Sequence, residues 1–215
     1  LDVYQRNTRD LLNRIPVRTN FDDRYFSDTY QALPLGGYTK LFERLLDHPN
    51  IEVQLNTDYF DVKQDIEGYE KLIYTGPIDR FFDFKFSSLQ SLEYRSINFV
   101  TETVDAEYFQ PNSVVNYPGA EVGFTRIIEY KHFGNQKSER TTVVREYTTD
   151  EGEPYYPVPT EKNRAVYETY RQAAEKLPDV YFVGRLANYK YFNMDQAFRN
   201  ALDVAADLFG RQATN

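Results

Sequence analysis

The residues best suited to chemistry in this sequence lie near its C-terminal end. An apolar segment at residues 180–183 is followed by Gly184, a polar loop and a helix-forming segment that starts after Asn193. A helix N-terminus that follows a strand and a loop presents free amides and the positive end of the helix dipole. This arrangement suits an electron-rich or anionic ring system such as a flavin.

Five residues of this segment are candidates for contact with such a cofactor: Arg185, Asn193, Met194, Asp195 and Gln196. The helix that begins there would stabilise negative charge at N1 and O2 of a reduced flavin. Asn193 and Asp195 are also good helix N-cap residues, and that purely structural interpretation stays open. Val62, on an expected middle strand, could contact the adenine end of FAD or could simply pack in the core.

One feature of a flavin-binding fold is missing from the sequence. Such a fold normally opens with a Gly-x-Gly-x-x-Gly turn after its first strand. Here only Gly36 and Gly37 are adjacent, and no such turn accompanies them. Because the sequence also starts at Leu1 rather than at Met, we expect the later part of a flavoenzyme whose first strand lies upstream.

Composition restricts the functions open to the chain. A net charge of −8 argues against a general nucleic-acid binder, so an anionic ligand would need locally placed Arg. The sequence has no Cys, which excludes disulfides and Cys nucleophiles and fits a cytoplasmic location. No apolar run reaches membrane-spanning length. His48 and His132 lack metal-ligand spacing, and we expect His132 and its neighbour Lys131 to be solvated.

Local patterns predict the helices and strands. Helices are expected at residues 38–47, with Thr39 as N-cap, and at residues 160–177 and 195–209. Strands are expected at residues 51–55, 59–63, 71–75 and 180–183. Residues 92–147 contain short aromatic and β-branched segments between turns, which predicts an antiparallel sheet. A helix that begins upstream is expected to end within residues 1–12.

Eight segments of the chain, in this order, resemble the UDP-galactopyranose mutase family. They are residues 14–18 (Arg-Ile-Pro-Val-Arg), 22–26, 37–43, 74–79 (Tyr-Thr-Gly-Pro-Ile-Asp), 115–117, 125–129, 154–157 and 184–195. Together they span nearly the whole chain, and several blocks in one register are more specific than any single block. The resemblance implies that the flavin fingerprint and a helical segment precede Leu1. The missing N-terminal region of the same protein would then be the partner of this chain.

The resemblance also assigns fold and domains. It implies a mixed α/β and α+β fold that combines part of a FAD-binding dinucleotide fold with an antiparallel substrate-binding sheet. Residues 1–36 would be the entry to the substrate domain, and residues 37–79 the middle of the FAD-binding domain. Residues 80–158 would form the antiparallel sheet, and residues 159–215 the C-terminal part of the FAD-binding domain. A homodimer is a further possibility.

Substrate contacts follow from the resemblance as well. Arg14 and Arg126 are placed on the substrate diphosphate, where guanidinium groups bind pairs of oxygens, and these two are the catalytic candidates. Other substrate-binding candidates are Tyr25, Asn116, Tyr156, Tyr191 and Asn193. Asn116 would bind a sugar or ribose hydroxyl. Tyr156 is preferred over Tyr155, because adjacent residues of an extended segment face opposite ways. Arg18 and Arg95 are weaker candidates.

Each of these residues also has a structural interpretation. An Arg can pair with one of the many carboxylates, and any single member of the 19 Tyr can be a packing residue. Asn116 can be a strand-edge or turn residue. No metal site and no hydrolytic triad is expected.

The reaction implied by the resemblance interconverts UDP-galactopyranose and UDP-galactofuranose, a step of cell-wall polysaccharide biosynthesis. N5 of reduced FAD would attack the anomeric carbon and displace UDP, and the resulting flavin–sugar adduct would open and reclose. This chain alone is expected to be inactive. Two other interpretations stay open: a fragment of an amine-oxidase-type flavoenzyme, and a non-catalytic module that binds nucleotide sugars.

Overall fold

The computed structural model describes residues 19–21, 26–84, 91–134 and 136–210, and these residues form two compact units. The first unit takes the described residues up to Glu67 together with Thr101–Asn116 and Arg126–Val144. The second unit takes Gly68–Val100, Tyr117–Thr125 and the described residues from Arg145 onward. The fourfold division expected from the sequence stays a prediction.

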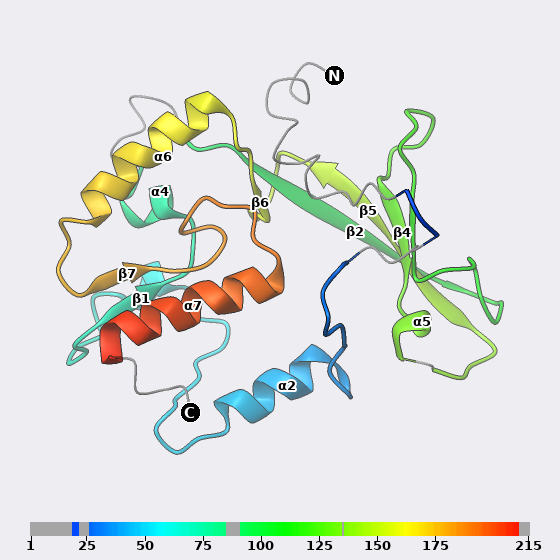
Figure 1. The fold of residues 1–215 in the computed structure, drawn as a ribbon, viewed down its shortest axis with the longest axis horizontal. Helices are drawn as coiled ribbons and strands as arrows, with labels where there is room; N and C mark the ends of the chain where they lie inside the picture. Colours follow the sequence, from blue (N-terminus) through cyan, green and yellow to red (C-terminus); the bar gives the residue numbers. More distant parts are fainter. Residues whose placement is uncertain (1–18, 22–25, 85–90, 135, 211–215) are drawn as a thin grey trace. The chain divides into compact units, whose positions relative to one another are not determined.

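The helices and strands are distributed over both units (Figure 1). The first unit contains α2 (Gly37–Leu46), α3 (Tyr59–Val62), β3 (Val114–Asn116), β4 (Arg126–Glu129) and α5 (Lys131–Gly134). The second contains β1 (Leu72–Tyr74), α4 (Ile78–Phe81), β6 (Tyr156–Pro157), α6 (Glu161–Ala174), β7 (Val180–Phe182) and α7 (Met194–Phe209). Two long strands, β2 (Tyr94–Val104) and β5 (Thr141–Thr149), contribute residues to both units.

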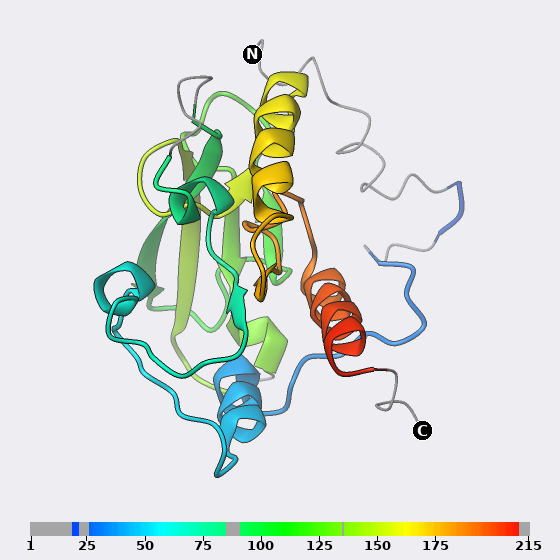
Figure 2. The ribbon, with the colours of Figure 1, turned by 90° about the vertical axis from the view of Figure 1, so that its left-hand side faces the viewer.

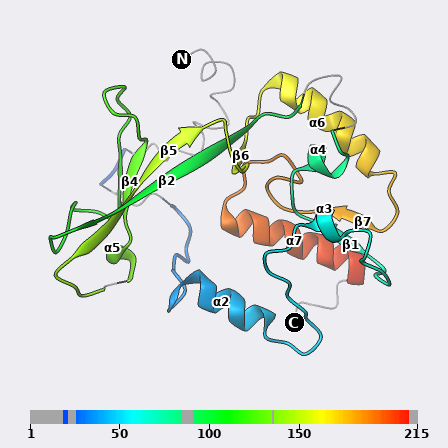
Figure 3. The same cartoon turned by 180° about the vertical axis from the view of Figure 1, so that it is seen from behind.

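Two sheets organise these elements (Figure 3). Five strands form a sheet of order β3-β4-β5-β2-β6, in which β3–β4 and β2–β6 pair antiparallel. This confirms the antiparallel sheet expected from the aromatic and β-branched segments. The second sheet consists of β1 and β7, which pair in parallel with Ile73 opposite Tyr181. The expected strands at residues 71–75 and 180–183 are therefore present.

The core of the second unit forms where α4 and α6 pack together. Ile78, Leu92, Val166, Tyr170 and Tyr189 are buried there in one cluster. The N-cap of α6 is Thr160, whose hydroxyl accepts a hydrogen bond from the Asn163 N–H at 3.1 Å. Helices α6 and α7 are seen as separate helices of this unit in Figure 2.

The interior of the first unit contains a buried carboxylate. Glu129 is 0% exposed and accepts hydrogen bonds from the N–H groups of Phe109 and Gln110 at 3.1 and 3.0 Å. The Thr141 hydroxyl donates at 2.6 Å, and Nε2 of His132 lies 3.2 Å away. Burial raises the pKa of Glu129, but these donors outweigh burial and lower the pKa below its usual value.

Beside this carboxylate, two sequence expectations are wrong. Lys131 is 5% exposed rather than solvated, and its ammonium donates to the carbonyls of Glu107, Ser138 and Arg140. His132 is half-buried against Glu129 rather than a surface residue. A buried ammonium is tolerated only when acceptors replace its water, and only the folded chain brings these carbonyls together.

Three other predictions fail in the segment that precedes β1. Residues 51–55 carry no strand, and residues 59–62 form the short helix α3, so Val62 does not lie on a middle strand. An alternating sequence becomes a strand only when a neighbouring strand accepts its backbone hydrogen bonds, and among the described residues none does so here. The N-cap of α2 is Gly36 at φ 85° rather than Thr39.

The remaining helix predictions are close to the structure. The last helix, α7, starts at Met194, one residue before its expected start, and ends at Phe209 as expected. The helix predicted to end within residues 1–12 lies outside the described part of the chain.

Candidate functional site

A cluster of aromatic rings and one guanidinium lies between β6 and α7 in the second unit. We call it the Arg185 cluster, and it consists of Tyr156, Arg185 and Tyr191. The rings of Tyr156 and Tyr191 stack with centroids 4.9 Å apart and an interplanar angle of 14°. The guanidinium carbon of Arg185 lies 4.8 Å from the Tyr156 centroid and 5.7 Å from the Tyr191 centroid. The structure thus brings together three residues that the sequence had singled out.

The backbone after β7 positions this arginine. Gly184 has φ 92°, a conformation that side-chain-bearing residues rarely adopt, and the chain turns there. Nε and Nη2 of Arg185 both donate to the Phe192 carbonyl, at 3.0 and 2.5 Å. Nη1 donates to the Tyr155 carbonyl at 3.4 Å. Arg185 therefore ties the loop after β7 to the residue just before the N-cap of α7.

The N-terminus of α7 comes directly after this anchored carbonyl. Asn193 is the N-cap, and its N–H donates to the Gln196 side-chain oxygen at 2.8 Å, as in a capping box. Met194, Asp195 and Gln196 are exposed. Since the first amides of a helix have no intrahelical acceptor, those of Met194 and Asp195 can donate to a ligand. The carboxylate of Asp195 partly offsets the positive potential at this end.

Tyr155 and Tyr156 have different neighbours, as expected for an extended segment. The ring of Tyr155 meets Phe99 edge-on at 6.1 Å, whereas Tyr156 stacks on Tyr191. In the β2–β6 pair, Tyr156 lies opposite Arg95. Of the adjacent tyrosines, Tyr156 is the one whose ring contacts other candidate residues.

Two further candidates meet in the first unit. Asn116 and Arg126 are paired in the antiparallel β3–β4 ladder. The Tyr117 N–H donates to the Thr125 carbonyl, and the Glu129 N–H donates to the Ser113 carbonyl. Tyr117–Thr125 and Ser113–Glu129 are therefore hydrogen-bonded pairs, and such pairs alternate with non-hydrogen-bonded ones along an antiparallel ladder. Asn116 and Arg126 are therefore a non-hydrogen-bonded pair, in which side chains on one face are closest. Both are exposed, so an amide and a guanidinium are presented side by side.

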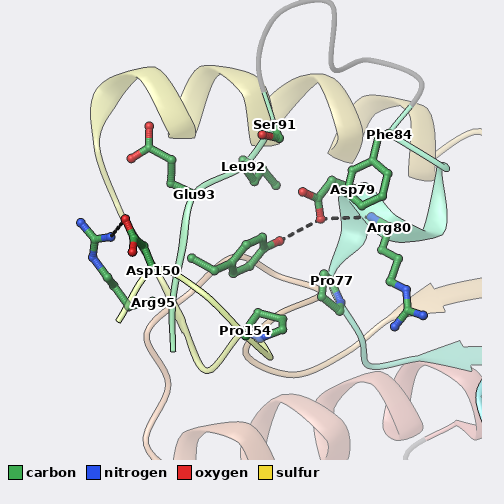
Figure 4. A pocket seen from close by; sticks show the side chains of 12 residues that line it. Pro77, Asp79, Arg80, Phe84, Ser91, Leu92, Glu93, Arg95, Asp150 and Pro154 are labelled. Atoms are coloured by element: carbon green, nitrogen blue, oxygen red, sulfur yellow. Dashed lines mark hydrogen bonds and ion pairs between the residues drawn. The ribbon is translucent and has the colours of Figure 1, made fainter. Parts of the chain in front are cut away.

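Arg95, a weaker candidate, lines a cavity of about 560 Å³ in the second unit (Figure 4). Its guanidinium lies 3.9 Å from the exposed carboxylate of Asp150. Deeper in the cavity, Asp79 is 2% exposed and accepts a hydrogen bond from the Tyr94 hydroxyl at 3.0 Å. Burial raises the pKa of Asp79. This geometry gives Arg95 a carboxylate partner, in line with its structural interpretation.

The other predicted site residues are not part of these groups. Arg14 and Tyr25 lie outside the described residues, as does Arg18. Val62 is the last residue of α3 and is partly exposed rather than buried in a core. Their assignments to substrate and cofactor stay predictions.

Sequence reasoning did not single out one connecting residue. The Tyr189 hydroxyl donates to the Glu93 carbonyl at 2.6 Å and accepts from the Val158 N–H at 3.2 Å, so it joins the residue before β2 to the residue after β6. No local signal distinguishes Tyr189 from the many other tyrosines, because its role depends on two distant backbone segments.

Metal-binding clusters and membrane-spanning helices are both absent from the described part of the chain. No three His, Cys, Asp or Glu side chains come together there as a metal ion would require. Among those same residues, every helix is too short or too polar to cross a membrane.

Comparison with known proteins decides the family. The sequence profile of the family described as UDP-galactopyranose mutase matches residues 4–191. The chain belongs to the UDP-galactopyranose mutase family. The Arg185 cluster lies within the matched range, whereas the N-terminus of α7 follows immediately after it.

Three curated mutases are similar to this chain over most of its length. A probable UDP-galactopyranose mutase of Klebsiella pneumoniae is 35% identical over 94% of this chain and 52% of its own length. The dTDP-fucopyranose mutase of Escherichia coli is 35% identical over 91% of this chain and 53% of its own length. The UDP-galactopyranose mutase of Mycoplasma genitalium is 33% identical over 93% of this chain and 53% of its own length. The chain thus spans about half the length of the curated mutases it matches.

A solved structure has a similar fold. The crystal structure of a reduced UDP-galactopyranose mutase superposes with a TM-score of 0.59 at 14% identity. The match covers 67% of this chain and 42% of that chain. The mixed α/β architecture with an antiparallel sheet is therefore an architecture also found in this mutase.

Proposed function

We propose that this chain is the substrate-sheet and distal flavin-binding part of a UDP-galactopyranose mutase. The observation that carries the proposal is the Arg185 cluster, in which one guanidinium joins two candidate substrate tyrosines to the residue before the α7 N-cap. Family membership supplies the reaction class, the interconversion of UDP-galactopyranose and UDP-galactofuranose. The region upstream of Leu1 would complete the enzyme.

In this proposal the chain binds the nucleotide sugar through two kinds of group. Arg126 and Arg14 hold the diphosphate, since guanidinium groups bind its oxygens in pairs and stabilise the charge of the departing UDP. Asn116, opposite Arg126 in the β3–β4 ladder, binds a sugar or ribose hydroxyl. Tyr25, Tyr156 and Tyr191 donate phenol hydrogen bonds to the phosphates.

The residues at the start of α7 fit a flavin. The exposed amides of Met194 and Asp195 and the Asn193 and Gln196 side chains are hydrogen-bonding groups at a positive helix end. They would hold the pyrimidine edge, and Val62 the adenine end. When bound and reduced, FAD supplies the electron pair that attacks the anomeric carbon. No side chain of this chain then needs to act as the nucleophile.

Arg185 has a positioning role in the proposed site. Because its guanidinium is hydrogen-bonded to the Phe192 carbonyl, it orients the chain from Tyr191 to the α7 N-cap. Its stack on Tyr156 fixes the ring beside the proposed substrate path. The cation in turn balances the negative charge expected on both substrate and reduced cofactor.

The Escherichia coli relative raises a second candidate substrate. That protein is named dTDP-fucopyranose mutase and is as similar to this chain as the Klebsiella pneumoniae relative. A diphosphate clamp and a flavin serve both reactions equally, whereas the two sugars differ at C6 and the two bases differ by a methyl group. We propose a nucleoside-diphosphate hexopyranose as the substrate class, with UDP-galactose as the first candidate because the family and two of these three relatives are named for it.

For the test, this chain is fused at its N-terminus to the half of the Klebsiella pneumoniae relative that it does not match. We call this fusion the extended enzyme. UDP-galactopyranose and dTDP-fucopyranose are incubated in parallel with this protein and FAD, with and without dithionite, and the products are separated by chromatography. Furanose product from UDP-galactose under reducing conditions only is expected. Conversion of dTDP-fucose alone would favour the second candidate, and full turnover by the oxidised protein would contradict the reduced-flavin mechanism.

The rival interpretations are less well supported. An amine-oxidase-type enzyme needs no diphosphate clamp, and family membership disfavours a module without catalysis. For location we propose the cytoplasm, where a chain without Cys and with a nucleotide-sugar substrate fits well. A homodimer remains part of the proposal.

A further inference from the structure

Tyr189 is a buried tyrosine with an unusual backbone conformation. Its φ is 47°, in the left-handed region that residues other than glycine seldom adopt, and the residue is 5% exposed. Such conformations persist only where the surrounding structure holds the residue in place, and they cluster at functional sites. The Tyr94 ring meets the Tyr189 ring edge-on at 5.4 Å, and the Tyr167 ring stacks on it at 5.8 Å. Tyr189 is therefore a fixed point of the second unit.

The Tyr189 hydroxyl reaches two segments that lie far away in the sequence. It donates to the Glu93 carbonyl, 96 residues away, and accepts from the Val158 N–H, 31 residues away. The Val158 N–H also donates to the Glu93 carbonyl at 3.1 Å. The hydroxyl thus lies beside a backbone hydrogen bond that joins the residue before β2 to the residue after β6.

Strand β6 has few hydrogen bonds of its own. It consists of Tyr156 and Pro157, and a proline has no N–H to donate to the neighbouring strand. The bond from Val158 to β2 is therefore a large part of what holds this segment, and it is the bond that the Tyr189 hydroxyl supports. Because Val158 follows Tyr156 by two residues, fixing Val158 also restricts the position of the Tyr156 ring.

The two stacked rings of the Arg185 cluster, Tyr156 and Tyr191, are here called the stacked pair. Their centroids are 4.9 Å apart, and both residues are partly buried. They come from separate segments, since one lies in β6 and the other in the loop between β7 and α7. Their stacking therefore depends on whatever ties these two segments together.

Arg185 and Tyr189 tie the two segments together at opposite ends. Arg185 donates to the Tyr155 carbonyl, directly before the first tyrosine of the stacked pair, and to the Phe192 carbonyl, directly after the second. Tyr189 lies two residues before the second tyrosine, and its hydroxyl binds Val158, two residues after the first. Each tyrosine of the pair is thus held through Arg185 on one side in the sequence and through Tyr189 on the other.

We propose that Tyr189 is a positioning residue that keeps the stacked pair in place for the substrate. This inference rests on the proposed function, in which Tyr156 and Tyr191 donate hydrogen bonds to the phosphates of the nucleotide sugar. Two phenols that must reach one diphosphate lose less conformational entropy on binding when the fold already holds them. Without the Tyr189 hydroxyl this constraint is lost, whereas the ring still fills the core.

The hydroxyl is the part of Tyr189 that the core does not need. Its ring contacts with Tyr94 and Tyr167 are between aromatic faces and edges, and a phenylalanine would keep them. Tyr167 is the matched control, because its ring belongs to the same aromatic group. Among the described residues its hydroxyl has no hydrogen-bond partner. Tyr189→Phe and Tyr167→Phe therefore remove the same atom from neighbouring rings, and only the first breaks the link between segments.

Fluorine NMR of the extended enzyme tests the geometry of the stacked pair without any ligand. A fluorotyrosine is incorporated at position 191 alone, so that its resonance reports the ring current of Tyr156. Tyr156→Ala gives the resonance of the unstacked ring. Tyr189→Phe should move the resonance toward this unstacked position, and Tyr167→Phe should leave it unchanged. An unmoved resonance in Tyr189→Phe would overturn the proposal, and so would equal shifts in the two variants.

Titration of the same variants with UDP tests the consequence for binding. Tyr189→Phe should weaken UDP binding about threefold to tenfold, and Tyr167→Phe should change it by less than about twofold. In the Tyr156→Ala background, Tyr189→Phe should have little further effect, because the stacked pair no longer exists. An equal loss in both backgrounds would show that Tyr189 acts elsewhere and would contradict the positioning role. Circular dichroism checks that each variant is folded.

The two measurements separate this inference from the proposed function. A fluorine shift as expected, together with unchanged UDP affinity in Tyr156→Ala and Tyr191→Phe, would leave the positioning role intact and contradict the assignment of these tyrosines to the phosphates. Weaker UDP binding in those two variants, without a fluorine shift in Tyr189→Phe, would do the reverse.

Discussion

At the scale of single residues, strand register explains where Arg126 lies. It lies in a non-hydrogen-bonded pair with Asn116, on an exposed position of β4. In the extended enzyme, Arg126→Ala should lower kcat/KM by the equivalent of about 2–4 kcal/mol, because a guanidinium of the proposed diphosphate clamp is lost. Steady-state kinetics measures this loss.

The choice of control for this variant depends on the structure. Lys131, a neighbour expected from the sequence to be solvated, is buried among three carbonyls and would report on folding instead. Arg199→Ala is a better match, since Arg199 is an exposed arginine that pairs with Asp203 across one helical turn of α7. Equal losses in both variants would argue against the clamp.

The stacked tyrosines allow hydroxyl and ring to be tested separately. Tyr156→Phe and Tyr191→Phe keep the rings that stack at 4.9 Å and remove only the phenol oxygen. Each should weaken UDP binding by roughly 0.5–1.5 kcal/mol, or more if the acceptor is a charged phosphate. Titration with UDP measures the change, and circular dichroism checks the fold. Unchanged affinity in both variants would make them packing residues.

Glu129 links folding of the first unit to pH. Its pKa is lowered in the folded state, so its contribution to stability is present above the unfolded value of about 4.5 and is lost as the pH falls below that value. Glu129→Gln should destabilise the protein by about 1–3 kcal/mol at pH 7, because an amide cannot accept from all of these donors.

Urea denaturation at several pH values measures this dependence. The difference in unfolding free energy between wild type and Glu129→Gln should shrink as the pH falls below 4.5. Glu139→Gln, at an exposed position of the same unit, is the matched control and should change little. A difference that stays constant down to about pH 3 would show that the carboxylate charge is irrelevant.

At the scale of elements, the N-terminus of α7 is the part that would tune the cofactor. Asn193 caps the helix without adding a charge. Asn193→Asp adds a negative charge beside the proposed flavin edge, where it disfavours the anionic reduced form, so the reduction potential of FAD in the extended enzyme should fall.

A redox titration against a reference dye measures that potential. Asp207→Asn, which changes charge by the same amount near the far end of α7, should leave it nearly unchanged. An unaltered potential in Asn193→Asp would mean that the start of α7 does not face the flavin.

At the scale of the whole molecule, the length of the chain matters most. It spans about half of its relatives, and its sequence lacks the Gly-rich turn whose amides hold a dinucleotide pyrophosphate. We therefore expect this chain alone to bind FAD weakly or not at all, and the extended chain to bind it tightly. Equilibrium dialysis of both proteins decides the point. Tight stoichiometric binding by the short chain would contradict its assignment as a partial enzyme.

Local signals in the sequence determined a large part of the fold. The helical spacing of α6 and α7 and the alternating segments of β2 and β5 act over a few residues, so the sequence predicts those elements. The blocks that identify the family are likewise a property of the sequence alone. The preference for Tyr156 over Tyr155 as a substrate residue rests on the local geometry of an extended segment and stays a prediction.

Only the tertiary structure decided which of these residues meet. Residues 51–55 alternate like a strand but pair with no strand among the described residues, and Lys131 is buried because carbonyls from three other positions surround it. The anchoring of Arg185 on the Phe192 carbonyl and the pairing of Asn116 with Arg126 depend on loop course and strand register. Such contacts join separate segments of the chain, and their free energy exists only once the surrounding chain has folded.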